Sequence, residues 1–90
     1  MGIKMTFIHA NDAFQYLMNN YYSIELLHIP EPEVKKWCEK NFGKEILIAH
    51  ESSGFLLNKN SRWDFWHAIP GMIYFFKNKE DATLFKLTWR

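Results

Sequence analysis

The sequence has one cysteine and four glycines in 90 residues, and both low counts exclude classes of protein. With Cys38 alone no disulfide can form within the chain, so we expect a reducing compartment, the cytoplasm. The glycines are isolated from one another, so no glycine-rich phosphate loop is present and no cofactor of the nucleotide type is expected. The longest apolar runs, at 46–49 and 72–76, are far shorter than the roughly 20 residues that a membrane helix needs.

An excess of one charge is also missing. Lysine and arginine together number 11, aspartate and glutamate 10, and the formal net charge is +1. Because no global field would steer the chain to phosphate, nucleic-acid contact would have to come from a local patch. The four histidines lie apart, none at helix-ligand spacing, and there is no Cys-x-x-Cys pair, so we expect no metal site.

Aromatic residues are what the chain has in excess, at 18% of the sequence. Hydrophobic residues as a whole make up 48%, which is enough apolar surface to offset chain entropy and fold. The length fits a single domain over residues 1–90, in which 1–20 would be either an integral part or an N-terminal extension.

The spacing of apolar residues predicts the secondary structure. Apolar side chains three to four residues apart predict helices at about 12–19, 32–42 and 79–88. Alternating or short apolar runs predict strands at 22–29, 45–50, 55–57, 62–67 and 72–77. We therefore expect an α+β fold, a small two-layer sandwich with one antiparallel sheet of about 4–5 strands. The helices 32–42 and 79–88 would cover one face of this sheet, beside the short N-terminal helix, and strand 55–57 would be an exposed edge.

Residues at the predicted helix ends match known capping preferences. Asn11 or Asp12 would cap the first helix and Asn78 the last, because short polar side chains accept hydrogen bonds from the free N–H groups of the first turn. Gly43 would end the second helix in a left-handed conformation.

The C-terminal part of the chain carries a longer pattern. A strand–helix unit of the form F-x-F-x-N-x-x-D-A-x-x-F-x-L-x-W is matched by Phe76, Asn78, Asp81, Ala82, Phe85, Leu87 and Trp89. The earlier helix contributes the pair Trp37-Cys38. In these features the chain resembles short open reading frames of tailed phages, notably phages of marine bacteria, over residues 22–43 and 62–89. The resemblance implies a phage-type accessory protein in the host cytoplasm and no particular activity.

The segment 62–67 is the main candidate for a binding surface. On a strand, Trp63 and Phe65 point to one face and Arg62 and Trp66 to the other, so one large ring would face solvent. Such a ring beside an arginine would anchor a protein interface or stack on a nucleic-acid base. The alternative is that Trp66 is covered by the N-terminal helix or the strand 55–57. The binding residues that we predict are Arg62, Trp63, Phe65, Trp66, Tyr21 and Tyr22.

Groups that could carry out catalysis are few. Cys38 lies in the middle of a helix on its apolar stripe, where a buried structural thiol is expected. The glutamates flank strands or helix starts and do not form the converging pair that acid–base chemistry needs. The lysines at 35, 36, 40 and 44 form a solvated helix face. We therefore assign no catalytic residue, metal ligand or cofactor.

Three functions remain as hypotheses. The leading one is a small non-catalytic binding protein, a phage-encoded accessory that contacts a host or phage protein or a second copy of itself, without a membrane. The alternative is a sequence-tolerant RNA or single-stranded DNA binder that uses exposed aromatics and predicts steep salt dependence. The third is a small enzyme that uses His67 or Cys38.

Overall fold

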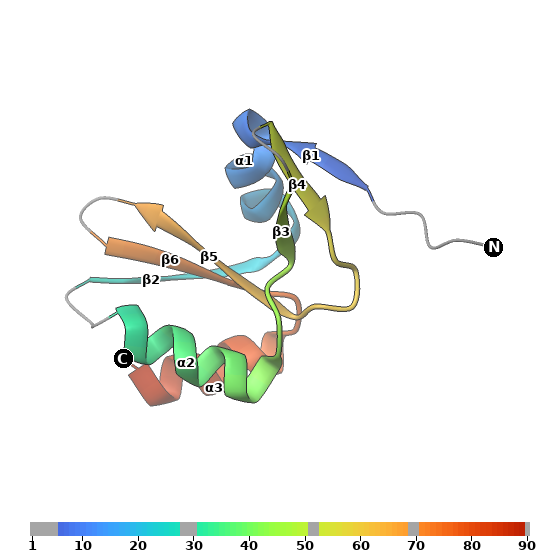
Figure 1. The fold of residues 1–90 in the computed structure, drawn as a ribbon. Coiled ribbons are helices and arrows are strands. Elements are labelled where there is room, and N and C mark those ends of the chain that lie inside the picture. Colours follow the sequence, from blue (N-terminus) through green and yellow to red (C-terminus); the bar gives the residue numbers. More distant parts are fainter. Residues whose placement is uncertain (1–5, 28–30, 51–52, 69–70, 90) are drawn as a thin grey trace.

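The computed structural model describes residues 6–27, 31–50, 53–68 and 71–89, which form an α+β fold (Figure 1). Its elements are β1 (Phe7–His9), α1 (Ala10–Asn20), β2 (Tyr22–Leu26), α2 (Glu31–Phe42), β3 (Leu47–His50), β4 (Gly54–Leu57), β5 (Trp63–Ala68), β6 (Gly71–Phe76) and α3 (Lys79–Trp89). The helices and most strands lie close to their predicted positions. The predicted end of the strand 22–29 falls on residues outside the described ranges.

The strands form two antiparallel sheets of three strands each, where the sequence predicted one sheet of about 4–5 strands. Sheet A has the order β1-β4-β3 and sheet B the order β2-β6-β5. β4 pairs on both sides, so the segment 55–57 is central and not the exposed edge that we expected. The sequence did not predict this division, because the alternation of residues along a strand indicates which face a side chain takes but not which strand lies beside it.

Helices α2 and α3 cover one face of sheet B, as predicted for these two helices (Figure 1). α2 buries Val34, Cys38 and Phe42, which recur every four residues and so share one side of the helix. α3 contributes Ala82 and Phe85 to the same cluster. The strands supply its other side chains, which are Ile24, Leu26, Trp63, Met72, Tyr74 and Phe76.

A second cluster joins α1 and sheet A to the opposite face of sheet B. α1 buries Ala13 and Leu17, and sheet B contributes Phe75 from β6. The remaining buried members, all from sheet A or the turn before it, are Ile8, Ile46, Leu47 and Leu57. The segment from β1 to α1 therefore packs on the rest of the chain, and both faces of sheet B are covered.

The helix ends bear out one capping prediction and correct two. Gly43 has φ +88° and its N–H donates to the carbonyl oxygen of Glu39 at 3.0 Å, which confirms the left-handed end of α2. α1 starts directly after β1, so its capping position is His9, whose side chain makes no capping bond. Asn78 precedes α3, but its side-chain NH2 donates to the Asp81 carboxylate at 3.2 Å, and no N–H of the described part of α3 donates to its Oδ1.

No helix in the described part of the chain is long and apolar enough to cross a membrane.

Candidate functional site

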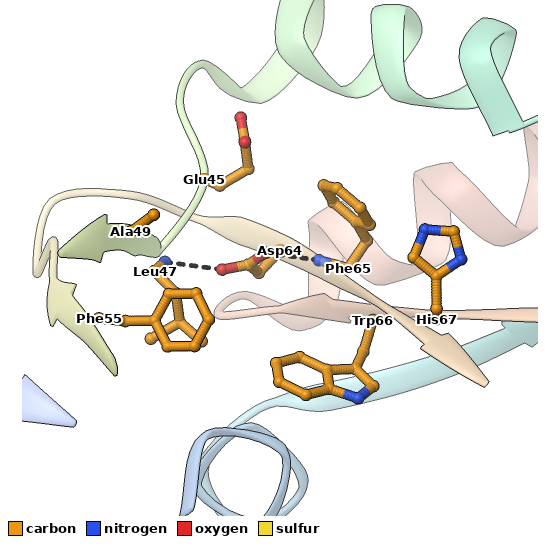
Figure 2. A pocket seen from close by; sticks show the side chains of 8 residues that line it. All are labelled: Glu45, Leu47, Ala49, Phe55, Asp64, Phe65, Trp66 and His67. Atoms are coloured by element: carbon orange, nitrogen blue, oxygen red, sulfur yellow. Dashed lines mark hydrogen bonds between the residues drawn. The ribbon is translucent and has the colours of Figure 1, made fainter. Parts of the chain in front are cut away.

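The candidate site lies where sheets A and B meet. β3 is an edge strand of sheet A, and β5 is an edge strand of sheet B. Glu45 and Trp63 form a parallel bridge, and the backbone N–H of Ile46 donates to the carbonyl oxygen of Trp63 at 2.9 Å. Beyond this bridge the strands diverge around a cleft of about 500 Å³, which we call the β3–β5 cleft (Figure 2). It is lined by Glu45, Leu47, Ala49, Phe55, Asp64, Phe65, Trp66 and His67.

Asp64 follows the bridge directly, at the point where the two strands begin to separate (Figure 2). The residue is only 5% exposed. Its Oδ2 accepts the backbone N–H of Leu47 at 2.6 Å, and its Oδ1 accepts the backbone N–H of Phe65 at 2.7 Å. The carboxyl group thus bonds to both strands and satisfies two N–H groups, one buried and one partly buried, that have no strand partner.

The surroundings of Asp64 favour the protonated form of its carboxyl group more than water does. The pKa of Asp64 is raised from 3.8 to about 7, first by burial and to a smaller extent by the nearby charge of Glu45. The two N–H bonds and the positive charge of Lys35 lower this pKa but do not offset burial. Among the described residues no lysine or arginine forms an ion pair with Asp64. Asp64 is therefore a buried acid without a cationic partner, on the wall of an open cleft.

Aromatic rings form much of the rest of the cleft wall. Trp66 packs against Phe14 of α1 and Phe55 of β4, with ring centroids 5.9 Å and 6.3 Å away. Phe65 points to the other face of sheet B and stacks on Trp63 at an interplanar angle of 23°. Because β5 is an edge strand, rings from both faces of the sheet reach the cleft (Figure 2).

The edge of β5 along the cleft presents backbone polar groups. Lys77 of the chain after β6 donates its N–H to the carbonyl oxygen of Arg62 at 2.9 Å. Since antiparallel pairing alternates, the even-numbered residues of β5 bond to β6, while Phe65 and His67 turn their backbone outward. The Phe65 N–H donates to the Asp64 side chain. The Phe65 carbonyl group and the N–H and carbonyl groups of His67 make no backbone hydrogen bond among the described residues. This edge is a template for another strand.

The structure brings together two of the six residues predicted to bind. Phe65 and Trp66 both line the cleft, and Trp66 is half-buried, with α1 and β4 covering part of it as the alternative interpretation expected. Trp63 is fully buried and its indole N–H donates to the Gly43 carbonyl at 2.7 Å, so it offers no surface to a partner. Arg62 is exposed but makes hydrogen bonds of 2.8 Å and 2.6 Å to Asp81.

The two predicted tyrosines lie away from the cleft. Tyr22 begins β2, which is the opposite edge strand of sheet B, and it is exposed. Tyr21 is half-buried and packs edge-on against Tyr16, with ring centroids 6.0 Å apart. Their part in binding stays a prediction, separate from the cleft.

Sequence reasoning missed the central residue of the site. The available signal for Asp64 was a single acidic residue within a strand of large aromatic rings. The contributions of Leu47, Ala49 and Phe55 had no local signal, because the placement of sheet A beside β5 depends on contacts between distant segments. Glu45 was interpreted only as a residue flanking a strand.

The two residues named for a possible enzyme differ in placement. Cys38 is fully buried, and burial raises the pKa of its thiol to about 12, which keeps it protonated at neutral pH. His67 lines the cleft with an exposed side chain whose Nε2 lies 3.7 Å from Oε1 of Glu31. Within the described ranges, no group of three or more His, Cys, Asp or Glu side chains is arranged to hold a metal ion.

Comparison of the chain with protein-family models, with curated proteins and with solved structures yields no match. The site itself therefore has to supply the argument for function.

Proposed function

We propose that this chain is a small non-catalytic binding protein that recognises another protein at the β3–β5 cleft, as an accessory protein of a tailed phage. The observation that carries the proposal is the edge of β5, where Phe65 and His67 present backbone groups beside an aromatic cleft. An extended segment of the partner would add to β5 as a strand through main-chain hydrogen bonds. Alternate side chains of that segment would enter the cleft.

The properties of β5 support strand addition. Natural sheet edges are commonly blocked by lysine, proline or a bulge. The described strand Trp63–Ala68 has neither residue, and it pairs with β6 in unbroken register. The cleft volume, about 500 Å³, also lies within the range of roughly 300–1,000 Å³ typical of binding pockets.

The nucleic-acid alternative has less support from the same residues. A phosphate in the cleft would meet the carboxyl groups of Glu45 and Asp64. Arg62, which this hypothesis uses together with the lysines of α2, is bonded to Asp81, and Trp63 has no exposed ring face for a base. It remains as an outcome of the experiment below.

Two proline variants test whether the edge of β5 is the site. His67→Pro removes an outward N–H on β5. β6 bonds to β5 and to β2 through alternate residues, so the backbone N–H of Ser23 in β2 also points away from the sheet. Ser23→Pro therefore removes an outward N–H on the opposite edge of sheet B. Neither substitution removes a bond of the sheet, so both variants should fold, which circular dichroism checks.

The tagged wild type and both variants are incubated with a bacterial host lysate, with and without nuclease, and captured proteins are identified by mass spectrometry. We expect a protein that is captured by the wild type and by Ser23→Pro, is lost with His67→Pro, and is indifferent to nuclease. Capture that survives His67→Pro would overturn the cleft as the site. Companions that disappear after nuclease would instead favour nucleic-acid binding.

Self-association is a second candidate, and a different surface favours it. Leu84 and Leu87 on α3 are 46% and 78% exposed and lie beside a shallow hollow of about 380 Å³. A second copy of the chain would cover these leucines and remove apolar surface from water. Sedimentation equilibrium of the wild type, Leu87→Glu and the matched control Thr88→Glu tests this. A dimer that only Leu87→Glu dissociates supports it, and a wild type that stays monomeric over about a hundredfold range of concentration rejects it.

A further inference from the structure

Resting on the proposed function, we propose that the β3–β5 cleft receives a lysine or arginine side chain from the partner's extended segment.

The charge of the cleft points to a cationic guest. Of its eight lining residues, Glu45 and Asp64 carry carboxyl groups, and none is lysine or arginine. The chain as a whole has a net charge of +1, so this concentration of acid is local. A guest carboxylate or phosphate would be repelled here, whereas an ammonium or guanidinium group would be attracted.

Asp64 has hydrogen-bonding capacity that the chain leaves unused. An ionised carboxyl group offers about four lone-pair positions. Two of them accept the N–H groups of Leu47 and Phe65. A cationic donor in the cleft would take a remaining position and form the charge-assisted bond that this buried acid lacks within the chain.

The depth of Asp64 selects for a long side chain. The residue is 5% exposed, so a group on the outer edge of β5 has to extend into the cleft to reach it. Lysine and arginine place their charge at the end of a flexible chain of methylene groups. Those methylene groups would pack on Leu47 and Ala49, the apolar residues that β3 contributes to the cleft.

Aromatic rings in the wall add to the preference for a cation. Lys35 already lies over the ring of Phe65, with its Nζ 5.0 Å from the ring centroid. The rings of Trp66 and Phe55 line the same cleft, and within the described ranges no cation lies over either ring. A guest cation would therefore find both a carboxyl group and ring faces, a combination that favours arginine and lysine over neutral side chains.

The test uses a displayed library of random dodecapeptides selected on the wild-type protein. Selected peptides are kept when His67→Pro abolishes their binding and Ser23→Pro does not. In each, a basic residue is replaced by its neutral analogue, citrulline for arginine or norleucine for lysine. Affinities are then measured for the wild type, Asp64→Asn, Glu45→Gln and the control Glu25→Gln, an exposed acid on β2.

We expect the neutral analogue to lose about tenfold or more in affinity for the wild type and for Glu25→Gln. The loss should shrink in Asp64→Asn and in Glu45→Gln, because the charge that the cation pairs with is then gone. If Asp64→Asn does not fold, Glu45→Gln carries the comparison, since the Glu45 side chain makes no hydrogen bond to the other described residues.

Three results would overturn the inference. Cleft-dependent peptides that lack a basic residue, or that tolerate the neutral analogue within about twofold, reject it and leave the proposed function intact. A loss that is the same in all four proteins places the cation elsewhere and also rejects it. If no selected peptide depends on the edge of β5, both proposals fail.

Discussion

The backbone N–H of Leu47 in β3 donates to the side chain of Asp64 in β5 at 2.6 Å, one residue after the backbone bond that joins the two strands. The preceding bond, from Ile46 N–H to the Trp63 carbonyl, is an ordinary backbone bond. A side chain therefore takes over the contact between β3 and β5 just as the strands separate. This substitution allows sheets A and B to remain attached at one end and open at the other, which creates the cleft.

We predict that Asp64 makes the protein less stable as pH rises from about 4 to 7. The folded-state pKa of about 7 lies above the unfolded value, so the folded state binds the proton more tightly and this contribution is lost as pH passes through the folded pKa. One pKa unit corresponds to about 1.4 kcal/mol, so the free energy of unfolding should fall by up to a few kcal/mol. Urea denaturation at several pH values measures it.

The control for this prediction is Asp64→Asn, which cannot ionise and should show a flatter pH profile. Glu45 and Lys35, whose charges act on Asp64, are present in both proteins and so cancel in the comparison. A wild-type profile that is flat, or that rises between about pH 5 and 8, would contradict the assignment.

A second prediction concerns the ion pair between Arg62 and Asp81. The Arg62 guanidinium, through its bonds to the carboxylate, lowers the pKa of Asp81, so this contribution is present above the unfolded pKa and is lost as pH falls through the folded value. The Arg62 side chain is 44% exposed, and solvent screening limits the pair to about 1 kcal/mol. A double-mutant cycle with Arg62→Ala and Asp81→Ala, run at neutral and at acidic pH, measures the coupling. Coupling that is unchanged in acid would refute this account.

A third prediction follows from the burial of Cys38. In the native protein the thiol should react with a disulfide reagent such as Ellman's reagent far more slowly than in about 6 M urea, because it is both inaccessible and protonated. The rate is followed by absorbance, with free cysteine as the reference. Reaction at the rate of the free thiol in native buffer would show that α2 does not cover this residue.

A fourth prediction separates two effects of adding a methyl group to glycine. At Gly54 a Cβ would overlap the carbonyl oxygen of Ile8 and the ring of Phe7, so Gly54→Ala should disturb the pairing of β1 with β4 and cost about 1–3 kcal/mol. At Gly43 nothing lies within 4 Å, and the cost is only that of a positive φ, about 1 kcal/mol. Thermal denaturation compares them, and a larger loss for Gly43→Ala would reverse the interpretation.

Local features of the sequence were enough to predict the helices and most of the strands. The spacing of Val34, Cys38 and Phe42 predicts which side of α2 is buried, and Gly43 predicts where the helix ends. β1 escaped prediction because a strand of three residues is too short for alternation to register. Only its pairing with β4 identifies Phe7–His9 as a strand.

The site was predicted in part for the same reason. Phe65 and Trp66 were recognisable as unusual within their own strand. That Asp64 would face Leu47 depends on the meeting of two segments 17 residues apart, which no local pattern records. The partner of Arg62 was hidden in the same way, because Asp81 lies on a helix at the end of the chain.

The two sheets alternate along the chain, and this order bears on how the protein folds. Sheet A uses the first, third and fourth strands, whereas sheet B uses the second, fifth and sixth. A fragment that ends after β4 would contain every strand of sheet A but would lack Phe75, the side chain from β6 that completes its core. Neither half can form a finished core during synthesis, so the chain should fold and unfold as a single cooperative unit.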